Sequence, residues 1–178
     1  MPISESHIRH TIANYAQRYG SWPKDLAHVT DLLGQGADPT SRKNFDGHLT
    51  ASAVLVNDHR QVLHIRHKAL GTLLRPGGHL EVDDTSLPHA ALRELTEETG
   101  IPAAHLVDEI PVHVDAHTIP ANDAKGEPEH RHIDFRFLFR TSGDSTVILQ
   151  VEEVTGYTWV PLHQLEPRTL ADRVTAQL

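Results

Sequence analysis

The sequence contains no cysteine among its 178 residues. This absence excludes disulfide bonds, thiolate nucleophiles and thiolate metal ligands, and it fits the reducing cytoplasm, where we expect the protein to act. No apolar run approaches the length of a membrane span. The first 20 residues are polar throughout, so we expect neither a secretory signal nor a membrane partner.

Positive charge is also scarce, with 16 Lys and Arg against 24 Asp and Glu and a net charge of −8. A chain this acidic is a poor candidate for binding duplex nucleic acid. If it handles phosphates, it needs a cation to screen them. Histidine, by contrast, is abundant at 15 residues, and its side chain titrates near neutral pH and binds metals well.

The hydrophobic pattern divides the chain into two regions. Residues 1–45 are predicted to form a helical extension, because Ile8, Ile12 and Tyr15 recur at helical spacing. We expect this extension to lie against the rest of the protein or against a second subunit. Residues 46–178 alternate between strand and helix patterns, and we expect them to form one domain. Its predicted strands lie at 49–56, 61–66, 110–119 and 130–140, and its predicted helices at 86–99 and 162–177.

The predicted helix at 86–99 gathers three glutamates on one face. Measured from Arg93 on a helical wheel, Glu97 lies at about 40°, Glu94 at about 100° and Glu98 at about 140°. Like charges three and four residues apart repel each other, and no lysine separates them. The face is either a solvated charged surface or a carboxylate site for a divalent cation such as Mg²⁺, which prefers oxygen ligands.

Residues 77–101, GGHLEVDDTSLPHAALRELTEETGI, resemble the Nudix box. The pattern of that family is Gly, five residues, Glu, seven residues, then Arg-Glu-apolar-x-Glu-Glu-x-Gly-apolar. The second half matches at every position from Arg93 to Ile101. In the first half, the sixth residue after Gly78 is Asp84 in place of Glu, and eight residues separate it from Arg93. We interpret this as a one-residue insertion with Asp84 in the acidic role.

The resemblance implies a Nudix-type α/β/α sandwich with a mixed β-sheet, and possession of a hydrolase activity. The implied reaction is cleavage of a nucleoside diphosphate linked to another moiety, or of a related diphosphate compound, by attack of water at phosphorus. Mg²⁺ is the implied cofactor, with Mn²⁺ as a substitute, and a homodimer is expected. The resemblance assigns metal binding to Gly78, Glu94, Glu97 and Glu98, and catalysis to Arg93 and the same three glutamates. Candidates for the general base are Glu97, Glu152 and Glu153.

Histidine and aspartate alternate with apolar residues in the segments 110–119 and 130–140. Because side chains along a strand alternate between faces, each segment has one apolar face and one His/Asp face. Three interpretations stay open: a hydrogen-bonded or solvent-facing polar surface, a contact with substrate phosphate, or a second site for a transition metal such as Zn²⁺. The guanidinium fork of arginine also matches phosphate oxygens. The candidate substrate-binding residues are Arg75, His117, His130, His132, Asp134 and Arg136.

Two other functions compete with hydrolysis by the acidic helix. One is a Nudix-fold domain that binds or senses a nucleotide without hydrolysing it, although such a domain has no need for the three glutamates. The other is a metalloenzyme whose site lies on the hairpin that the segments 110–119 and 130–140 would form, which we call the His/Asp hairpin. In that case the acidic helix is only a charged surface. The sequence does not select one diphosphate substrate among those that the family hydrolyses.

Overall fold

The computed structural model describes residues 3–20, 24–101, 104–142 and 146–178. Within these residues the α-helices are α1 (Glu5–Tyr19), α2 (Lys24–Gly34), α3 (Leu87–Thr99) and α4 (Arg168–Gln177), with short 3₁₀ turns η1 (Asp123–Lys125) and η2 (Leu162–Gln164). The strands are β1 (His48–Val56), β2 (Gln61–His67), β3 (Leu73–Leu74), β4 (Gly77–His79), β5 (His105–Leu106), β6 (His113–Ile119), β7 (His130–Arg140) and β8 (Val154–Pro161).

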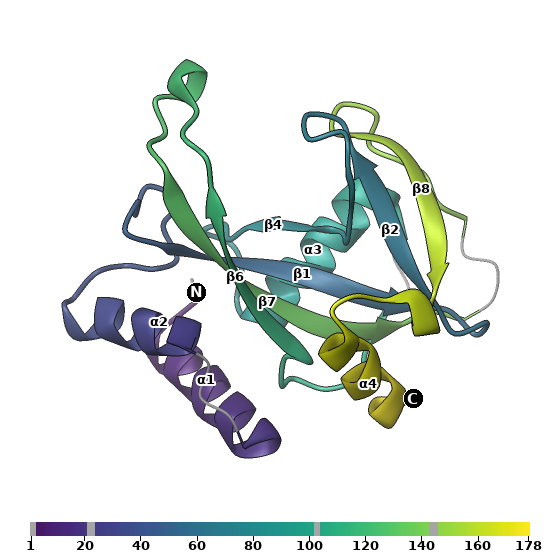
Figure 1. Ribbon diagram of the computed structural model, residues 1–178, viewed down its shortest axis with the longest axis horizontal. Coiled ribbons are helices and arrows are strands. Elements are labelled where there is room, and N and C mark those ends of the chain that lie inside the picture. Colours follow the sequence, from purple (N-terminus) through teal and green to yellow (C-terminus); the bar gives the residue numbers. More distant parts are fainter. Residues whose placement is uncertain (1–2, 21–23, 102–103, 143–145) are drawn as a thin grey trace.

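The strands form one mixed, curled sheet (Figure 1). Its main order is β3-β2-β1-β7-β5, with β4 paired to β1, β6 to β7 and β8 to β2. Only β1 and β7 run parallel among these pairs. The β1–β2 register joins Val56 to Val62 at one end of the hairpin, while β4 pairs with the other half of β1. The strands β2 and β8 therefore turn away from β1 (Figure 1).

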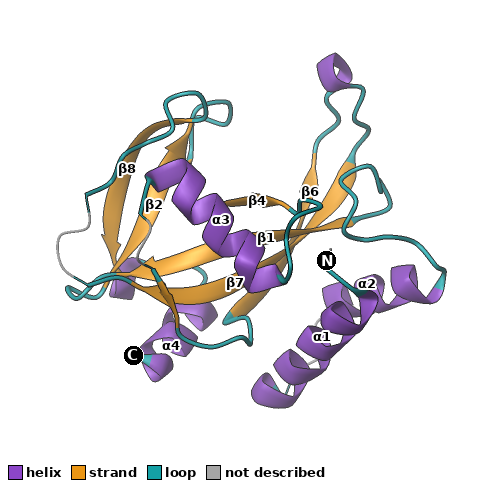
Figure 2. Cartoon of the chain, turned by 180° about the vertical axis from the view of Figure 1, so that it is seen from behind, coloured by secondary structure: helices purple, strands orange, loops and turns teal. Residues whose placement is uncertain are grey.

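Helices cover both faces of the sheet, with α3 on one face and α4 on the other (Figures 1 and 2). On the α3 side, Leu49 and Phe135 belong to a buried cluster that includes Leu95. On the opposite side, Val54 and Leu138 belong to a second buried cluster with residues of α4. This arrangement confirms the predicted α/β/α sandwich with a mixed sheet.

The buried residues of the two N-terminal helices belong to the same core as the sheet. Helix α1 starts at Ser4, whose Oγ accepts a hydrogen bond from the backbone N–H of His7 at 3.1 Å. Its apolar stripe, which includes Ile8 and Tyr15, belongs to the same buried cluster as the α3 side of the sheet. Arg173 of α4 also donates to the Tyr15 hydroxyl at 2.6 Å. The division of the chain at residue 45 and the homodimer stay predictions.

Two predicted elements differ from the structure at their starts. The helix predicted at 162–177 is a 3₁₀ turn followed by α4, which begins only at Arg168. Pro167 explains the break, because a proline disfavours the helical conformation in the residue before it. The strand predicted at 110–119 begins at His113. Of the helices in the described ranges, none has the length and hydropathy needed to cross a membrane.

Candidate functional site

Helix α3 presents its acidic face to a pocket of about 870 Å³. The helix is capped at its start by Ser86, whose Oγ accepts from the backbone N–H of His89 at 3.2 Å. It ends at Gly100, whose φ of 64° suits a residue without a side chain. The pocket walls come from β1, β4, β6, β7 and α3 and from the loops before β4 and β8. Its lining includes Glu94, Glu97, Glu98, Glu152, Glu153, Arg75, Arg136, Gly78, His117, His132 and Asp134.

The glutamates of α3 lie against the backbone of β4. The Gly77 N–H donates to Glu98 Oε2 at 3.0 Å, and Glu98 is only 3% exposed. A Cβ atom added to Gly78 would lie 2.6 Å from Glu94 Oε1. Position 78 therefore admits only glycine while Glu94 keeps this place. Glu97 is half exposed at the rim.

Two of these carboxylates bind protons more tightly than an ordinary glutamate. Burial raises the pKa of Glu94 to about 7, although Arg93 partly opposes the shift. Burial also raises the pKa of Glu98 to about 8, and the charges of Glu94 and Glu153 add to it. A buried carboxylate pair of this kind favours either protons or a cation. Three acids with backbone oxygens nearby form the set of hard oxygen donors that suits Mg²⁺.

Arg93 holds the acidic face together. Its Nη1 donates to Glu94 Oε1 at 3.1 Å and to Glu97 Oε2 at 2.9 Å, and its Nη2 donates to the His79 carbonyl at 2.9 Å. Its Nε and Nη2 also donate to the two oxygens of Asp84, at 3.1 and 3.0 Å. The arginine thus connects two of the glutamates with β4 and with the loop before α3.

Asp84 is fully buried and is not among the residues that line the pocket. Besides Arg93, it accepts from the backbone N–H of Glu81 at 2.8 Å. Burial opposes ionisation, but the hydrogen bonds from Arg93 and Glu81 hold the pKa of Asp84 below its usual value. Asp84 therefore acts on the site through Arg93, because its own carboxylate does not line the pocket.

The opposite wall of the pocket carries a polar network on β1 and β7. Asp134, itself buried, accepts hydrogen bonds from Thr50 Oγ1 at 3.2 Å and from Ser52 Oγ at 2.7 Å. Arg136 donates to Asp134 Oδ2 and to Asp115 Oδ2, both at 2.9 Å. The structure thus supplies two fixed carboxylate partners that hold the Arg136 guanidinium at the pocket.

Arg75 reaches the same pocket without a comparable set of partners. Its buried Nε has no hydrogen-bond partner within the described part of the chain. Burial, together with the nearby charge of Arg136, lowers the pKa of Arg75 to about 10. Buried polar atoms are nearly always hydrogen-bonded in folded proteins. An unpaired guanidinium Nε beside a pocket therefore indicates a place for an anionic ligand.

The predicted His/Asp hairpin exists, with β6 and β7 antiparallel and His117 opposite His132. Figure 1 shows it projecting from the body of the protein. His117 and His132 line the pocket, whereas His130 does not. A hydrogen bond from His117, together with Arg136, holds the pKa of Asp115 at about 2. Burial, together with the neighbouring histidines, lowers the pKa of His132 to about 3.

Several residues near the site escaped the sequence-based predictions. His48, Thr50 and Ser52 alternate along β1, on the side of the strand that carries Asp134 and Arg136 across the β1–β7 pair. Their spacing of two was a usable signal, but the strand read as an apolar run. His79 of β4 lies opposite Thr50. The three candidates for a general base, Glu97, Glu152 and Glu153, all line the pocket.

Comparison with known proteins adds independent observations. A family model described as the NUDIX domain matches residues 46–177. The "Probable DHNTP pyrophosphohydrolase" of Lactococcus lactis subsp. cremoris is 40% identical over 98 residues, which are 53% of this chain and 55% of that protein. The chain thus spans about half the length of this curated relative.

Two solved structures share the fold. A NUDIX-family hydrolase from Clostridium perfringens has a TM-score of 0.54 and 23% identity, covering 73% of this chain and 95% of the other. The dihydroneopterin triphosphate pyrophosphohydrolase of E. coli has a TM-score of 0.53 and 15% identity, covering 72% and 92%. At these identities the similarity establishes the shared fold and nothing further.

Proposed function

The chain belongs to the Nudix family, and from this membership we propose that it is a Mg²⁺-dependent pyrophosphohydrolase. Its substrate is a small organic diphosphate or triphosphate, either a nucleotide or a related compound. The main support for the proposal is that three glutamates and two arginines line the same pocket. The glutamates suit a cation and the arginines suit phosphate oxygens, so both halves of a metal–phosphate complex have partners.

The carboxylates fit Mg²⁺ by their chemistry. Glu94, Glu97 and Glu98 would hold the ion, with a backbone carbonyl at Gly77 or Gly78, while Mn²⁺ would substitute for it. When bound, Mg²⁺ supplies positive charge that screens phosphate oxygens and lowers the pKa of water. Without such a cation, the burial of Glu94 and Glu98 leaves two mutually repelling carboxylates in a poorly solvated place.

The chain's own residues divide the remaining work of phosphoryl transfer, which needs mainly positioning and charge stabilisation. Arg93 fixes the directions of Glu94 and Glu97 through hydrogen bonds. Arg75 and Arg136 would grip the phosphate chain, since each presents a guanidinium to the pocket. A proton taken from the attacking water would pass to Glu97, Glu152 or Glu153.

The rest of the substrate would lie along the β6–β7 side of the pocket. His117, His132 and Asp134 provide hydrogen-bonding groups there. The Lactococcus relative is named for DHNTP, and an enzyme with the same fold is named for dihydroneopterin triphosphate. We therefore place dihydroneopterin triphosphate first among the substrates to be tested, ahead of ADP-ribose, nucleotide sugars and dinucleoside polyphosphates.

The test is a screen of these compounds with Mg²⁺ and with Mn²⁺, in which pyrophosphate and phosphate release are both measured. In Glu98→Gln, the turnover of any substrate found should fall by at least about 100-fold, because one charged ligand of the cation is lost. Glu129→Gln is the matched control, since Glu129 is exposed and lies outside the pocket lining.

Two outcomes would contradict the proposal. If the wild type binds one of these compounds but hydrolyses none, the domain is a binding module. If turnover survives Glu98→Gln but is lost in His132→Ala, the reaction belongs to the histidine hairpin instead of the acidic helix.

A further inference from the structure

Five histidine rings gather at the end of β1, β4, β6 and β7 that lies toward the hairpin. His132 is central: its ring centroid lies 4.6 Å from that of His48, 5.1 Å from His130, 5.0 Å from His79 and 5.8 Å from His117. We call these five residues the histidine cluster. They come from four strands, and the pairing of β1 with β4 and β7 and of β7 with β6 brings them together.

Backbone carbonyls fix the orientation of two of these rings. His48 Nδ1 lies 3.0 Å from the Asn44 carbonyl oxygen, and His130 Nδ1 lies 2.7 Å from the Pro128 carbonyl oxygen. A carbonyl oxygen can only accept, so each Nδ1 must carry the hydrogen. Each neutral ring then presents the lone pair of Nε2. Histidines that bind metals almost always have this second contact from the other ring nitrogen to a carbonyl or carboxylate.

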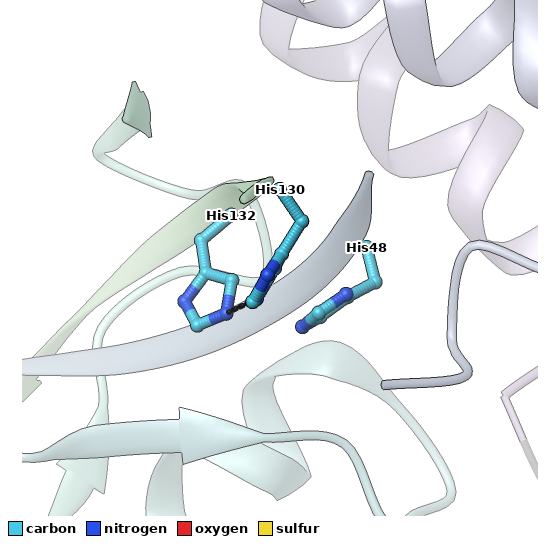
Figure 3. A group of neighbouring side chains, drawn as sticks. All are labelled: His48, His130 and His132. Atoms are coloured by element: carbon cyan, nitrogen blue, oxygen red, sulfur yellow. Dashed lines mark hydrogen bonds between the residues drawn. The ribbon is translucent and has the colours of Figure 1, made fainter. Parts of the chain in front are cut away.

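The rings of His48, His130 and His132 lie close together, and Figure 3 shows His130 between the other two. His48 Nε2 is buried and has no hydrogen-bond partner among the residues that the structure describes. His130 Nε2 lies 3.2 Å from His132 Nε2. One ring nitrogen from each of the three residues lies within 4.8 Å of those of the other two.

These distances are close to those of a tetrahedral zinc site. With Zn–N distances of about 2.0–2.1 Å, two ligand nitrogens lie about 3.3–3.4 Å apart. The His130–His132 pair already has this separation, and the remaining separations need to close by at most about 1.5 Å, which small rotations of a side chain achieve. We infer that His48, His130 and His132 bind one Zn²⁺ ion through their ring nitrogens, at a site separate from the carboxylates of α3.

Ligand chemistry keeps the two sites apart. Imidazole nitrogen suits Zn²⁺, whereas Mg²⁺ prefers oxygen ligands. His48 and His130 do not line the pocket that holds the glutamates, while His132 does. Three protein ligands leave the fourth position of a tetrahedral ion to water or to a group from the pocket. Binding requires His132 only to move its proton from Nε2 to Nδ1, so no ring changes its charge.

A hydrogen-bonded network without metal explains the cluster less well. A satisfied network would pair each buried ring nitrogen, yet His48 Nε2 is left unpaired. A neutral histidine also has only one donor and one acceptor, so three rings that face one another cannot pair all of their nitrogens. A cation that accepts three lone pairs removes both difficulties.

The first experiment measures Zn²⁺ affinity of the full chain after EDTA treatment, by competition with a chromophoric chelator. An excess of Mg²⁺ fills the carboxylates of α3, so that Zn²⁺ reports on the histidines. We expect one Zn²⁺ per chain. The variants His130→Gln and His132→Gln should each weaken binding by at least about 100-fold, more than the 10- to 100-fold typical when only a hydrogen-bond partner of a ligand is lost.

Matched controls separate this site from others. His105 is exposed on β5, so His105→Gln should keep the wild-type affinity. Glu98→Gln should also keep it, because the carboxylates play no part. The inference is overturned if the wild type binds no Zn²⁺ under these conditions, if the two cluster variants bind as the wild type does, or if Glu98→Gln abolishes binding.

A second measurement requires no variant and stands even where a substitution prevents folding. Co²⁺ added to the wild type in excess Mg²⁺ should give an intense visible absorption band, because tetrahedral Co²⁺ absorbs strongly. One equivalent of Zn²⁺ should remove the band. A weak spectrum typical of six oxygen ligands would contradict the three-histidine site.

Discussion

At the scale of single residues, Asp84 shows how a side chain outside the pocket shapes the pocket's chemistry. It accepts two hydrogen bonds from Arg93, which in turn donates to Glu94 and Glu97. The Asp84–Arg93 ion pair therefore fixes the position of Arg93, and Arg93 in turn orders Glu94 and Glu97. The shorter side chain of aspartate suffices for this role because the loop before α3 brings its backbone close to Arg93.

Replacing Asp84 by asparagine removes the negative charge that Arg93 faces in the interior. Breaking a buried pair by removing one partner costs about 3–5 kcal/mol. Arg93 keeps its contacts to Glu94, Glu97 and the His79 carbonyl, so we expect Asp84→Asn to lower the free energy of unfolding by about 2–3 kcal/mol. Urea unfolding followed by circular dichroism measures the change.

The neighbouring aspartate provides the control for this substitution. Asp83 is exposed, so Asp83→Asn should change the free energy of unfolding by less than about 0.5 kcal/mol. Equal losses in the two variants would show that Asp84 has no special place. Restored stability in Asp84→Glu would show that the charge, rather than the length of the side chain, is what Arg93 requires.

At the scale of secondary-structure elements, sequence patterns predicted the features that depend on residues close together in the chain. The helix predicted at 86–99 corresponds to α3, whose two ends are capped by Ser86 and Gly100. The alternation of His and Asp with apolar residues predicted the facing polar sides of β6 and β7, which pair as expected. Such patterns are readable because each requires only neighbours within a few residues.

The sequence patterns did not predict contacts between segments that are far apart in the chain. The parallel pairing of β1 with β7 sets His48 opposite His132, and nothing near His48 indicates this partner. Thr50 and Ser52 alternate within a strand that is mostly apolar, so their bonds to Asp134 appear only in the fold. The unpaired Nε of Arg75 likewise depends on the surroundings that burial creates.

The end of α3 gives a prediction at this scale. Gly100 has a φ of 64°, and a Cβ added there would lie 3.0 Å from both the Cβ and the carbonyl oxygen of Ile148. The segment around Ile148 is tied to the helix end, because the Ile148 N–H donates to the Thr99 carbonyl at 2.8 Å. We expect Gly100→Ala to lower the free energy of unfolding by about 2 kcal/mol, combining backbone strain with crowding.

Gly126 allows the two causes to be separated. Its φ of 67° is nearly the same, but a Cβ there would meet no atom within 4 Å. Gly126→Ala should therefore cost only the strain of about 1 kcal/mol. Thermal and urea unfolding of both variants measures the difference. An equal loss of stability in the two would mean that Ile148 moves aside without lowering the free energy of unfolding.

At the scale of the whole molecule, the buried glutamates link folding to protons and to Mg²⁺. The pKa of Glu94 is raised to about 7 and that of Glu98 to about 8, both above the value of about 4.3 in an unfolded chain. Above the unfolded pKa, the folded protein therefore binds more protons than the unfolded chain. Stability from this source is fully present at low pH and is lost as pH rises through the folded pKa.

Buried histidines act in the opposite sense, but over a lower range. The pKa of His79 and of His113 is lowered to about 4 and that of His132 to about 3, each chiefly by burial. These rings are charged in the unfolded chain below about pH 6.5, so they make stability rise with pH up to that value. Above it their contribution levels off, so between pH 7 and 8.5 the larger change comes from the glutamates.

In EDTA, we therefore expect the free energy of unfolding to fall by about 1 kcal/mol or more between pH 7 and 8.5, since one proton corresponds to about 1.4 kcal/mol per pH unit. In Glu98→Gln the fall should be much smaller, because the side chain no longer ionises. Adding Mg²⁺ should raise wild-type stability more at pH 8.5 than at pH 7, since the cation replaces protons that have already left. Urea unfolding at both pH values, with and without Mg²⁺, tests all three expectations. A wild-type curve that is flat in EDTA would mean that Glu98 is charged and solvated at pH 7, and the carboxylates of α3 would then bind Mg²⁺ without releasing protons.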